Sequence, residues 1–199
     1  MIAELYPQAW AHLEAAKQAK SELATCWNNL LESNFLDVSV VTDSDSSGRI
    51  VVYANWPAGA RDQLTALFRS CVNELWACLD ALVVESVAMF SNLKRPRNPE
   101  QPRYFPIADC QENFDALLAE SCLDGVLQLQ FEMIRDCQPF QQLPEDERIE
   151  RFRSGLRQLV DWTNRLDEGS RVGVWVTPIE PQVHVEEPTR IDYLKAQEP

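Results

Sequence analysis

Apolar residues recur every three or four positions in two long stretches of the chain, and this spacing predicts two long helices. The first covers residues 7–33, where Pro7 suits the first turn of a helix. The second covers residues 60–92 and is apolar on nearly all sides, which is typical of a helix at the centre of a bundle. Three shorter helices are predicted over residues 111–120, 126–136 and 144–166.

Two segments have the composition of β-strands. Residues 35–53 contain two β-rich runs around a polar loop that ends at Gly48, which predicts a hairpin. Residues 171–186 include an alternating run with Val172, Val174 and Val176 on one side. We therefore expect an α+β, mainly helical fold, in which a helical bundle surrounds the central helix 60–92 and residues 35–53 and 171–186 form a small antiparallel sheet.

The length and composition are those of one domain. The chain has 199 residues, of which 45% are hydrophobic, and this is enough to bury a sizeable core. We expect residues 1–187 to form a single helical domain and residues 188–199 to form a polar tail. The sequence has neither a signal-peptide pattern nor an apolar run of membrane-spanning length, so we expect a cytoplasmic protein with no membrane partner.

The cysteine and histidine pattern predicts neither disulfides nor a metal centre. Six cysteines occur without a C-x-x-C pair, and we expect most of them to be buried free thiols. The two histidines, His12 and His184, lie near opposite ends of the chain, so no zinc-ligand spacing is present. The sequence also lacks a glycine-rich phosphate loop, and we expect no cofactor.

Charge narrows the choice of partners. The net charge is −13, and residues 111–170 alone contain thirteen acidic and six basic side chains. Such a surplus of carboxylates makes direct binding to a nucleic-acid backbone improbable. The run that opens the last helix has two interpretations: a solvated surface that aids solubility, or an acidic face for a basic protein partner. The residues of this acidic face are Glu145, Asp146, Glu147 and Glu150.

One loop concentrates positive charge. Lys94, Arg95, Arg97 and Arg103 lie in a proline-rich segment that follows the central helix. The segment is either a proline-pinned surface loop or a small nucleic-acid contact, for which Tyr104 and the following phenylalanine would supply aromatic stacking.

The central helix and two short motifs carry a family resemblance. The run Val-Asn-Glu-Leu-Trp-Ala-Cys-Leu-Asp-Ala-Leu-Val at residues 72–83 resembles a helix with the pattern L-H-N-L-R-S-A-L-D-H-L-V, which occurs in uncharacterised bacterial and phage proteins. A Phe-Pro-Ile motif at 105–107 and a Gln-Pro-Phe motif at 138–140 follow in the same order. The pattern is similar to that of HEPN-type helical domains, and the resemblance covers residues 5–180 in layout. It implies a relative of metal-independent RNases or nucleotide-binding modules, and a homodimer.

The residues that carry catalysis in such domains are replaced here. The arginine and histidine of the R-x4-H signature correspond to Trp76 and Ala81, which can neither stabilise an anion nor transfer a proton. The resemblance therefore implies a catalytically inactive copy, with no catalytic residues. Asn73, Trp76, Asp80 and Glu85 would be the remnant of a pocket, with Glu85 exposed at its rim. Alternatively, Asp80 is a structural anchor that accepts a hydrogen bond from a backbone N–H or an arginine.

Three functional hypotheses follow. The first is a non-enzymatic acidic interaction factor, from a phage or mobile element, which binds and inhibits a basic, nucleic-acid-binding host protein. The second is a HEPN-like RNase or nucleotide-handling enzyme that uses Asp80, Glu85, Asn73 and the basic loop. The third is a structural subunit of a homo-oligomer.

Overall fold

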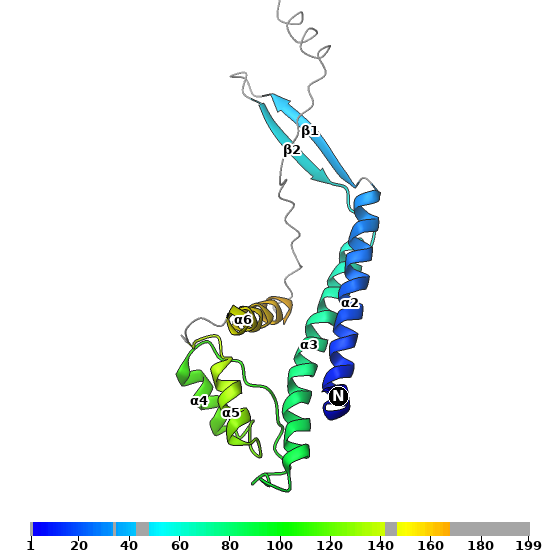
Figure 1. The fold of residues 1–199 in the computed structure, drawn as a ribbon. Helices are drawn as coiled ribbons and strands as arrows, with labels where there is room; N and C mark the ends of the chain where they lie inside the picture. Colours follow the sequence, from blue (N-terminus) through cyan, green and yellow to red (C-terminus); the bar gives the residue numbers. More distant parts are fainter. Residues whose placement is uncertain (1, 34, 43–47, 142–146, 168–199) are drawn as a thin grey trace, which may run out of the picture.

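The computed structural model of the protein describes residues 2–33, 35–42, 48–141 and 147–167. The fold is mainly helical, as the sequence predicts. Two long helices pack side by side, and three of the shorter ones lie along one side of the pair (Figure 1). The helices are α1 (Ile2–Leu5), α2 (Pro7–Glu32), α3 (Ala60–Phe90), α4 (Gln111–Ala119), α5 (Gln128–Asp136) and α6 (Glu147–Asp167).

Helices α2 and α3 form a long antiparallel pair. Three alanines, Ala9, Ala16 and Ala19, are buried along α2, and their small side chains let the two helices approach closely. His12 Nδ1 lies 2.7 Å from Glu74 Oε2 across this interface. The sequence places His12 on the helix surface, whereas the structure half-buries its side chain between the two helices because α3 packs on that side of α2.

A β-hairpin connects the two long helices at one end of the pair (Figure 1). Strands β1 (Leu36–Thr42) and β2 (Gly48–Ala54) pair in antiparallel register, with Leu36 opposite Ala54. Phe35 is buried at the base of the hairpin, where its ring centroid lies 6.0 Å from that of Trp27 and 5.1 Å from that of Trp56. The residues expected to extend the sheet, 171–186, lie outside the described residues, as do His184 and the expected tail at 188–199.

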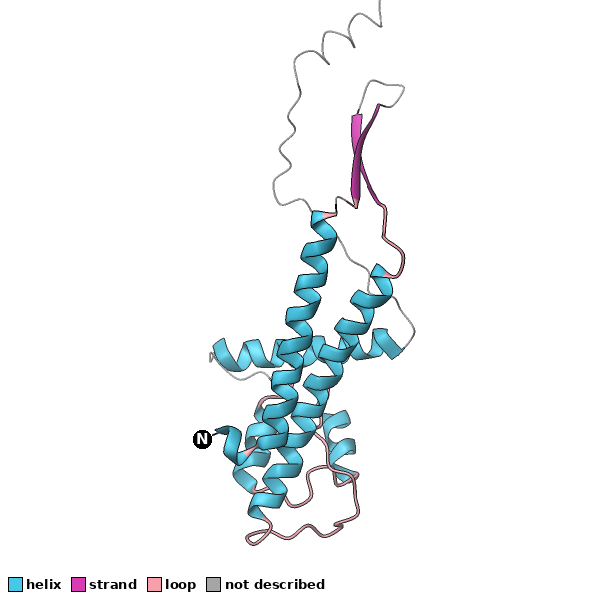
Figure 2. Ribbon diagram, turned by 90° about the vertical axis from the view of Figure 1, so that its right-hand side faces the viewer, coloured by secondary structure: helices cyan, strands magenta, loops and turns pink. Residues whose placement is uncertain are grey.

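The main hydrophobic core lies on a second face of α3. Val72, Val83 and Val87 of α3 pack there against Phe105 in the connecting loop and Leu156 of α6. Figure 2 shows α6 running across the long axis of the α2–α3 pair. Helix α3 is therefore contacted on separate sides by α2 and by the C-terminal half of the described chain, in agreement with the predicted central helix. Within the described ranges, no helix combines the length and apolar character needed to cross a membrane.

Candidate functional site

The four residues predicted to be a pocket remnant point to different neighbours along α3. Trp76 donates a hydrogen bond from Nε1 to Thr163 Oγ1 of α6 at 2.7 Å. Asp80 accepts one through Oδ1 from the backbone N–H of Phe105 at 2.8 Å. Asn73 is exposed on the helix surface. The structure therefore does not gather these side chains into one site.

Asp80 accepts a hydrogen bond from a backbone N–H, as its interpretation as a structural anchor requires. Its carboxylate holds the segment that follows the basic loop against α3, at the edge of the main core. Desolvation raises the pKa of Asp80, and the Phe105 N–H opposes that shift by stabilising the ionised form. The residue is a half-buried polar anchor for the connection between α3 and α4.

Glu85 caps the first turn of α2. Its Oε1 accepts a hydrogen bond from the N–H of Gln8 at 2.8 Å, and its Oε2 accepts one from Ala9 at 3.1 Å. The residue before the helix, Tyr6, makes no side-chain cap, so Glu85 satisfies free amides that local sequence leaves open. Glu85 is partly exposed, and it reaches these amides because the antiparallel packing brings the start of α2 beside it.

Two residues of the basic loop, Lys94 and Arg103, donate hydrogen bonds to main-chain carbonyl oxygens. Lys94 Nζ donates a hydrogen bond to the carbonyl oxygen of Val126 at 2.6 Å. Arg103 donates from Nε to the carbonyl oxygen of Asp124 at 3.0 Å, and its guanidinium also binds carbonyl oxygens of the loop itself. Arg95 and Arg97 are exposed. The structure therefore favours the interpretation of this segment as a pinned surface loop.

The described part of the acidic face is paired within α6. Glu147 Oε1 lies 2.7 Å from Arg151 Nη2, and both side chains are highly exposed. Glu150 Oε2 lies 3.5 Å from Nη1 of the buried Arg153. Glu145 and Asp146 lie outside the described residues. Exposed pairs of this kind contribute little to stability, so these carboxylates remain available to a partner.

Two arginines of α6 bind the end of α5 and the loop after it. Arg153 donates from Nε and Nη2 to the carbonyl oxygen of Asp136, at 3.1 and 2.8 Å. Arg157, one turn later, donates from Nη2 to the carbonyl oxygen of Pro139 at 2.8 Å. Carbonyl oxygens at a helix end carry partial negative charge, which accounts for the buried position of Arg153. Through Arg153, Glu150 lies close to the end of α5.

The Phe-Pro-Ile and Gln-Pro-Phe motifs meet at Gln138. This side chain is fully buried and makes three hydrogen bonds. Its Nε2 donates to the carbonyl oxygens of Pro106 and Ile134, and its Oε1 accepts from the N–H of Ala108. Because every polar atom of the amide is satisfied, the two motifs have a structural explanation that is independent of catalysis.

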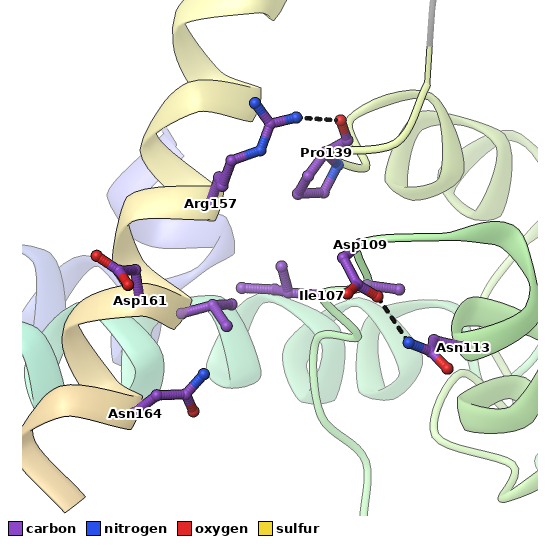
Figure 3. Close-up of a pocket in the computed structure, with 9 residues that line it drawn as sticks. Ile107, Asp109, Asn113, Pro139, Arg157, Asp161 and Asn164 are labelled. Atoms are coloured by element: carbon purple, nitrogen blue, oxygen red, sulfur yellow. Dashed lines mark hydrogen bonds between the residues drawn. The ribbon is translucent and has the colours of Figure 1, made fainter. Parts of the chain in front are cut away.

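A surface cavity of about 370 Å³ lies between α6 and the start of α4 (Figure 3). Asp109 and Asn113 line one side, and their side chains hydrogen-bond at 2.6 Å. Arg157, Asp161 and Asn164 line the α6 side. The bond from Asn113 is the main reason that the pKa of Asp109 is lowered. The cavity offers hydrogen-bond donors and two carboxylates beside apolar side chains such as that of Ile107.

Sequence inspection missed this cavity, although a signal exists. Arg157, Asp161 and Asn164 recur at helical spacing and share one face of α6, and Asp109 lies just before α4, four residues ahead of Asn113. No local sequence pattern shows that the residues of α6 and those near the start of α4 meet in the fold. Ile107 of the Phe-Pro-Ile motif and Pro139 of the Gln-Pro-Phe motif line the cavity together.

An apolar groove of about 320 Å³ lies on another side of α3. Its lining includes Leu82 and Ser86 of α3, Tyr6, and Met133 and Ile134 of α5. Helix α5 has no buried residue, so one of its faces is uncovered by the rest of the described chain.

The cysteines are free thiols, and most are less buried than expected. Only Cys122 is buried, and burial raises the pKa of its thiol to about 11. The other five are partly exposed. In the described part of the chain, no group of three or more histidine, cysteine or acidic side chains is placed to hold a metal ion.

Comparisons with models of protein families, with curated proteins and with solved structures find no match to this chain. The resemblance to HEPN-type domains therefore remains a prediction from the sequence.

Proposed function

We propose that this protein is a non-enzymatic acidic interaction factor that binds a basic protein partner. The observation that carries the proposal is that four cationic side chains point to the main chain of the protein itself. Lys94, Arg103, Arg153 and Arg157 all donate to main-chain carbonyl oxygens. These groups stabilise loops and helix ends, whereas most of the surplus carboxylates lie at the surface.

This arrangement favours a partner of opposite charge. With a net charge of −13, the chain attracts a basic surface over a distance set by ionic strength and repels phosphate backbones. A basic protein that normally binds nucleic acid presents such a surface. By occupying it, the acidic protein would exclude the nucleic acid and inhibit that partner, as expected of a factor from a phage or mobile element.

The contacts of the α3 residues support this proposal over an RNase. Asp80 and Glu85 satisfy backbone amides of the fold, and Arg103 binds its own loop. Catalysis of phosphodiester cleavage needs such groups to converge on one reacting phosphate.

The proposal extends to the setting of the protein. We place it in the cytoplasm, without a membrane partner, without a cofactor and without direct nucleic-acid binding. We also propose that residues 171–186 form further strands beside the β1–β2 hairpin. The alternative function is that of a structural subunit that forms a homodimer.

The test begins with capture by the tagged full chain from a host lysate treated with nuclease. Each captured protein is then purified and titrated by calorimetry at low and high salt. We expect a basic partner whose affinity falls steeply as salt rises. Neutralising Glu145, Asp146, Glu147 and Glu150 together should weaken binding by about tenfold, or about 1.4 kcal/mol.

A matched control removes the same charge elsewhere. The variant E14Q/E22Q/E32Q/D37N neutralises four carboxylates of α2 and β1 and should change the affinity by less than about threefold. Equal losses in both variants would mean that only net charge matters. A salt-independent partner, retained RNA, or cleavage of added RNA by the purified chain would contradict the proposal.

A further inference from the structure

The exposed face of α5 combines apolar and acidic side chains in one stripe. Leu129, Glu132, Met133 and Asp136 occupy positions i, i+3, i+4 and i+7, which share one side of a helix. The Leu129 side chain is 69% exposed and that of Met133 is 61% exposed. Single exposed apolar residues are common on protein surfaces, but two on adjacent turns form an apolar ridge.

The ridge continues into the apolar groove beside it. Met133 belongs to both, because it lines the cavity of about 320 Å³ together with Tyr6, Leu82 and Ile134. Groove and ridge thus form one apolar surface with α5 at its edge. Flexible methionine side chains are common at surfaces that bind partner helices, because they adapt to different shapes.

The two carboxylates of the α5 stripe make only weak contacts with cations. Glu132 accepts a hydrogen bond from the neutral amide of Gln128 at 2.9 Å. Asp136 contacts Arg135 only at 3.4 Å. Arg153 Nη2 donates to the carbonyl oxygen of Asp136 at the end of α5, and its Nη1 lies 3.5 Å from Glu150 Oε2 at the start of α6. No lysine or arginine is among the described residues that line the groove.

These features select one kind of occupant. A lipid surface with anionic headgroups is repelled by a chain of net charge −13, and so is a second copy of the same chain. An amphipathic helix with an apolar stripe flanked by lysine or arginine matches both the groove and its rim. We infer that the exposed face of α5 and the adjoining groove dock a basic amphipathic helix of the partner. This inference rests on the proposed function and specifies its binding site.

The test uses a defined probe instead of the unidentified partner. A fluorescein-labelled synthetic peptide of about 16 residues carries leucines at i, i+3, i+4 and i+7 and lysines elsewhere. Its binding to the full-length chain is followed by fluorescence anisotropy. A scrambled peptide of the same composition measures charge attraction alone, and circular dichroism checks that each variant is folded.

Three variants separate the apolar and ionic contributions. The double variant L129A/M133A should weaken peptide binding by about tenfold, because both anchors are removed. The control L93A truncates a side chain that is 75% exposed in the loop after α3, outside the groove, and should leave affinity within about twofold. The variant E132Q should weaken binding by about two- to threefold and reduce its salt dependence.

Several results would overturn the inference. They are unchanged affinity in L129A/M133A, an equal loss in L93A, equal binding of the scrambled peptide, and binding to anionic vesicles that the double variant abolishes. Self-association that depends on the same two side chains would replace the partner helix with a second copy. If a captured basic partner binds L129A/M133A normally, the docking site is wrong and the proposed function stands. If the peptide docks as expected but no basic partner is captured, the function is wrong.

Discussion

Removing the Gln138 side chain should destabilise the protein strongly. In Q138A, the carbonyl oxygens of Pro106 and Ile134 and the N–H of Ala108 all lose their hydrogen-bond partner. The Gln138 side chain is 0% exposed, so water cannot replace these bonds without a structural change. At about 1 kcal/mol for each bond, with a further contribution from the cavity, we expect a loss of about 3–5 kcal/mol. That is a large part of the roughly 5–15 kcal/mol that stabilises a typical domain.

The assay is urea unfolding followed by far-ultraviolet circular dichroism. Q138M keeps most of the side-chain volume but none of the hydrogen bonds, so its loss isolates the polar contribution. Q138E keeps the acceptor for Ala108 but turns its second oxygen toward two carbonyl oxygens. It should be less stable than Q138M at neutral pH and recover partly at acidic pH, when the carboxyl can donate. The control Q158A removes an exposed amide from α6 and should change stability by less than about 0.5 kcal/mol. A loss below about 1 kcal/mol in both Q138A and Q138M would refute the reasoning.

Three further predictions address single contacts. E85A removes the cap of α2 and should lower the free energy of unfolding by about 1–2 kcal/mol, with faster amide hydrogen exchange confined at first to the start of that helix. D80N keeps an acceptor for the Phe105 N–H but carries no charge. Because the folded state raises the pKa of Asp80, ionisation of this carboxyl lowers the stability of the wild type as pH rises above the ordinary pKa of 3.8. The advantage of D80N over the wild type in urea unfolding should therefore grow from acidic to neutral pH. G125A should destabilise by about 2–4 kcal/mol in thermal or urea unfolding, because Gly125 has φ +92° and a Cβ would lie 2.9 Å from a valine side chain of α3, whereas G155A, in open space within α6, should stabilise by about 0.5–1 kcal/mol. Equal effects of the two glycine substitutions, an unchanged helix start in E85A, or a pH-independent difference for D80N would contradict these expectations.

The helices could be predicted because their signals are local. Apolar spacing, the proline at the start of α2 and the acidic residues before α6 act within a few residues of the backbone they influence. Asp80 is an intermediate case. A carboxylate within an apolar helix indicates a buried acceptor, but the donor, the backbone N–H of Phe105, is 25 residues away.

The candidate sites were much less predictable, since their parts meet only through packing. Glu85 caps a helix whose first turn lies 77 residues earlier in the chain. No local pattern distinguishes that role from an exposed surface carboxylate. Likewise, the Phe-Pro-Ile and Gln-Pro-Phe motifs are visible in the sequence, but the hydrogen bonds that join them at Gln138 span about 30 residues.

By itself, the sequence determined which segments become helices and that the surface carries surplus negative charge. Both properties depend on residue type and on neighbours along the chain. The tertiary structure decided which cations turn inward to carbonyl oxygens, and which face of α5 stays uncovered. The pattern of Leu129, Glu132, Met133 and Asp136 is legible in the sequence as one side of a helix. Whether that side is buried or free depends on where α1, α3 and α6 pack, and this is set by contacts between residues far apart in the chain.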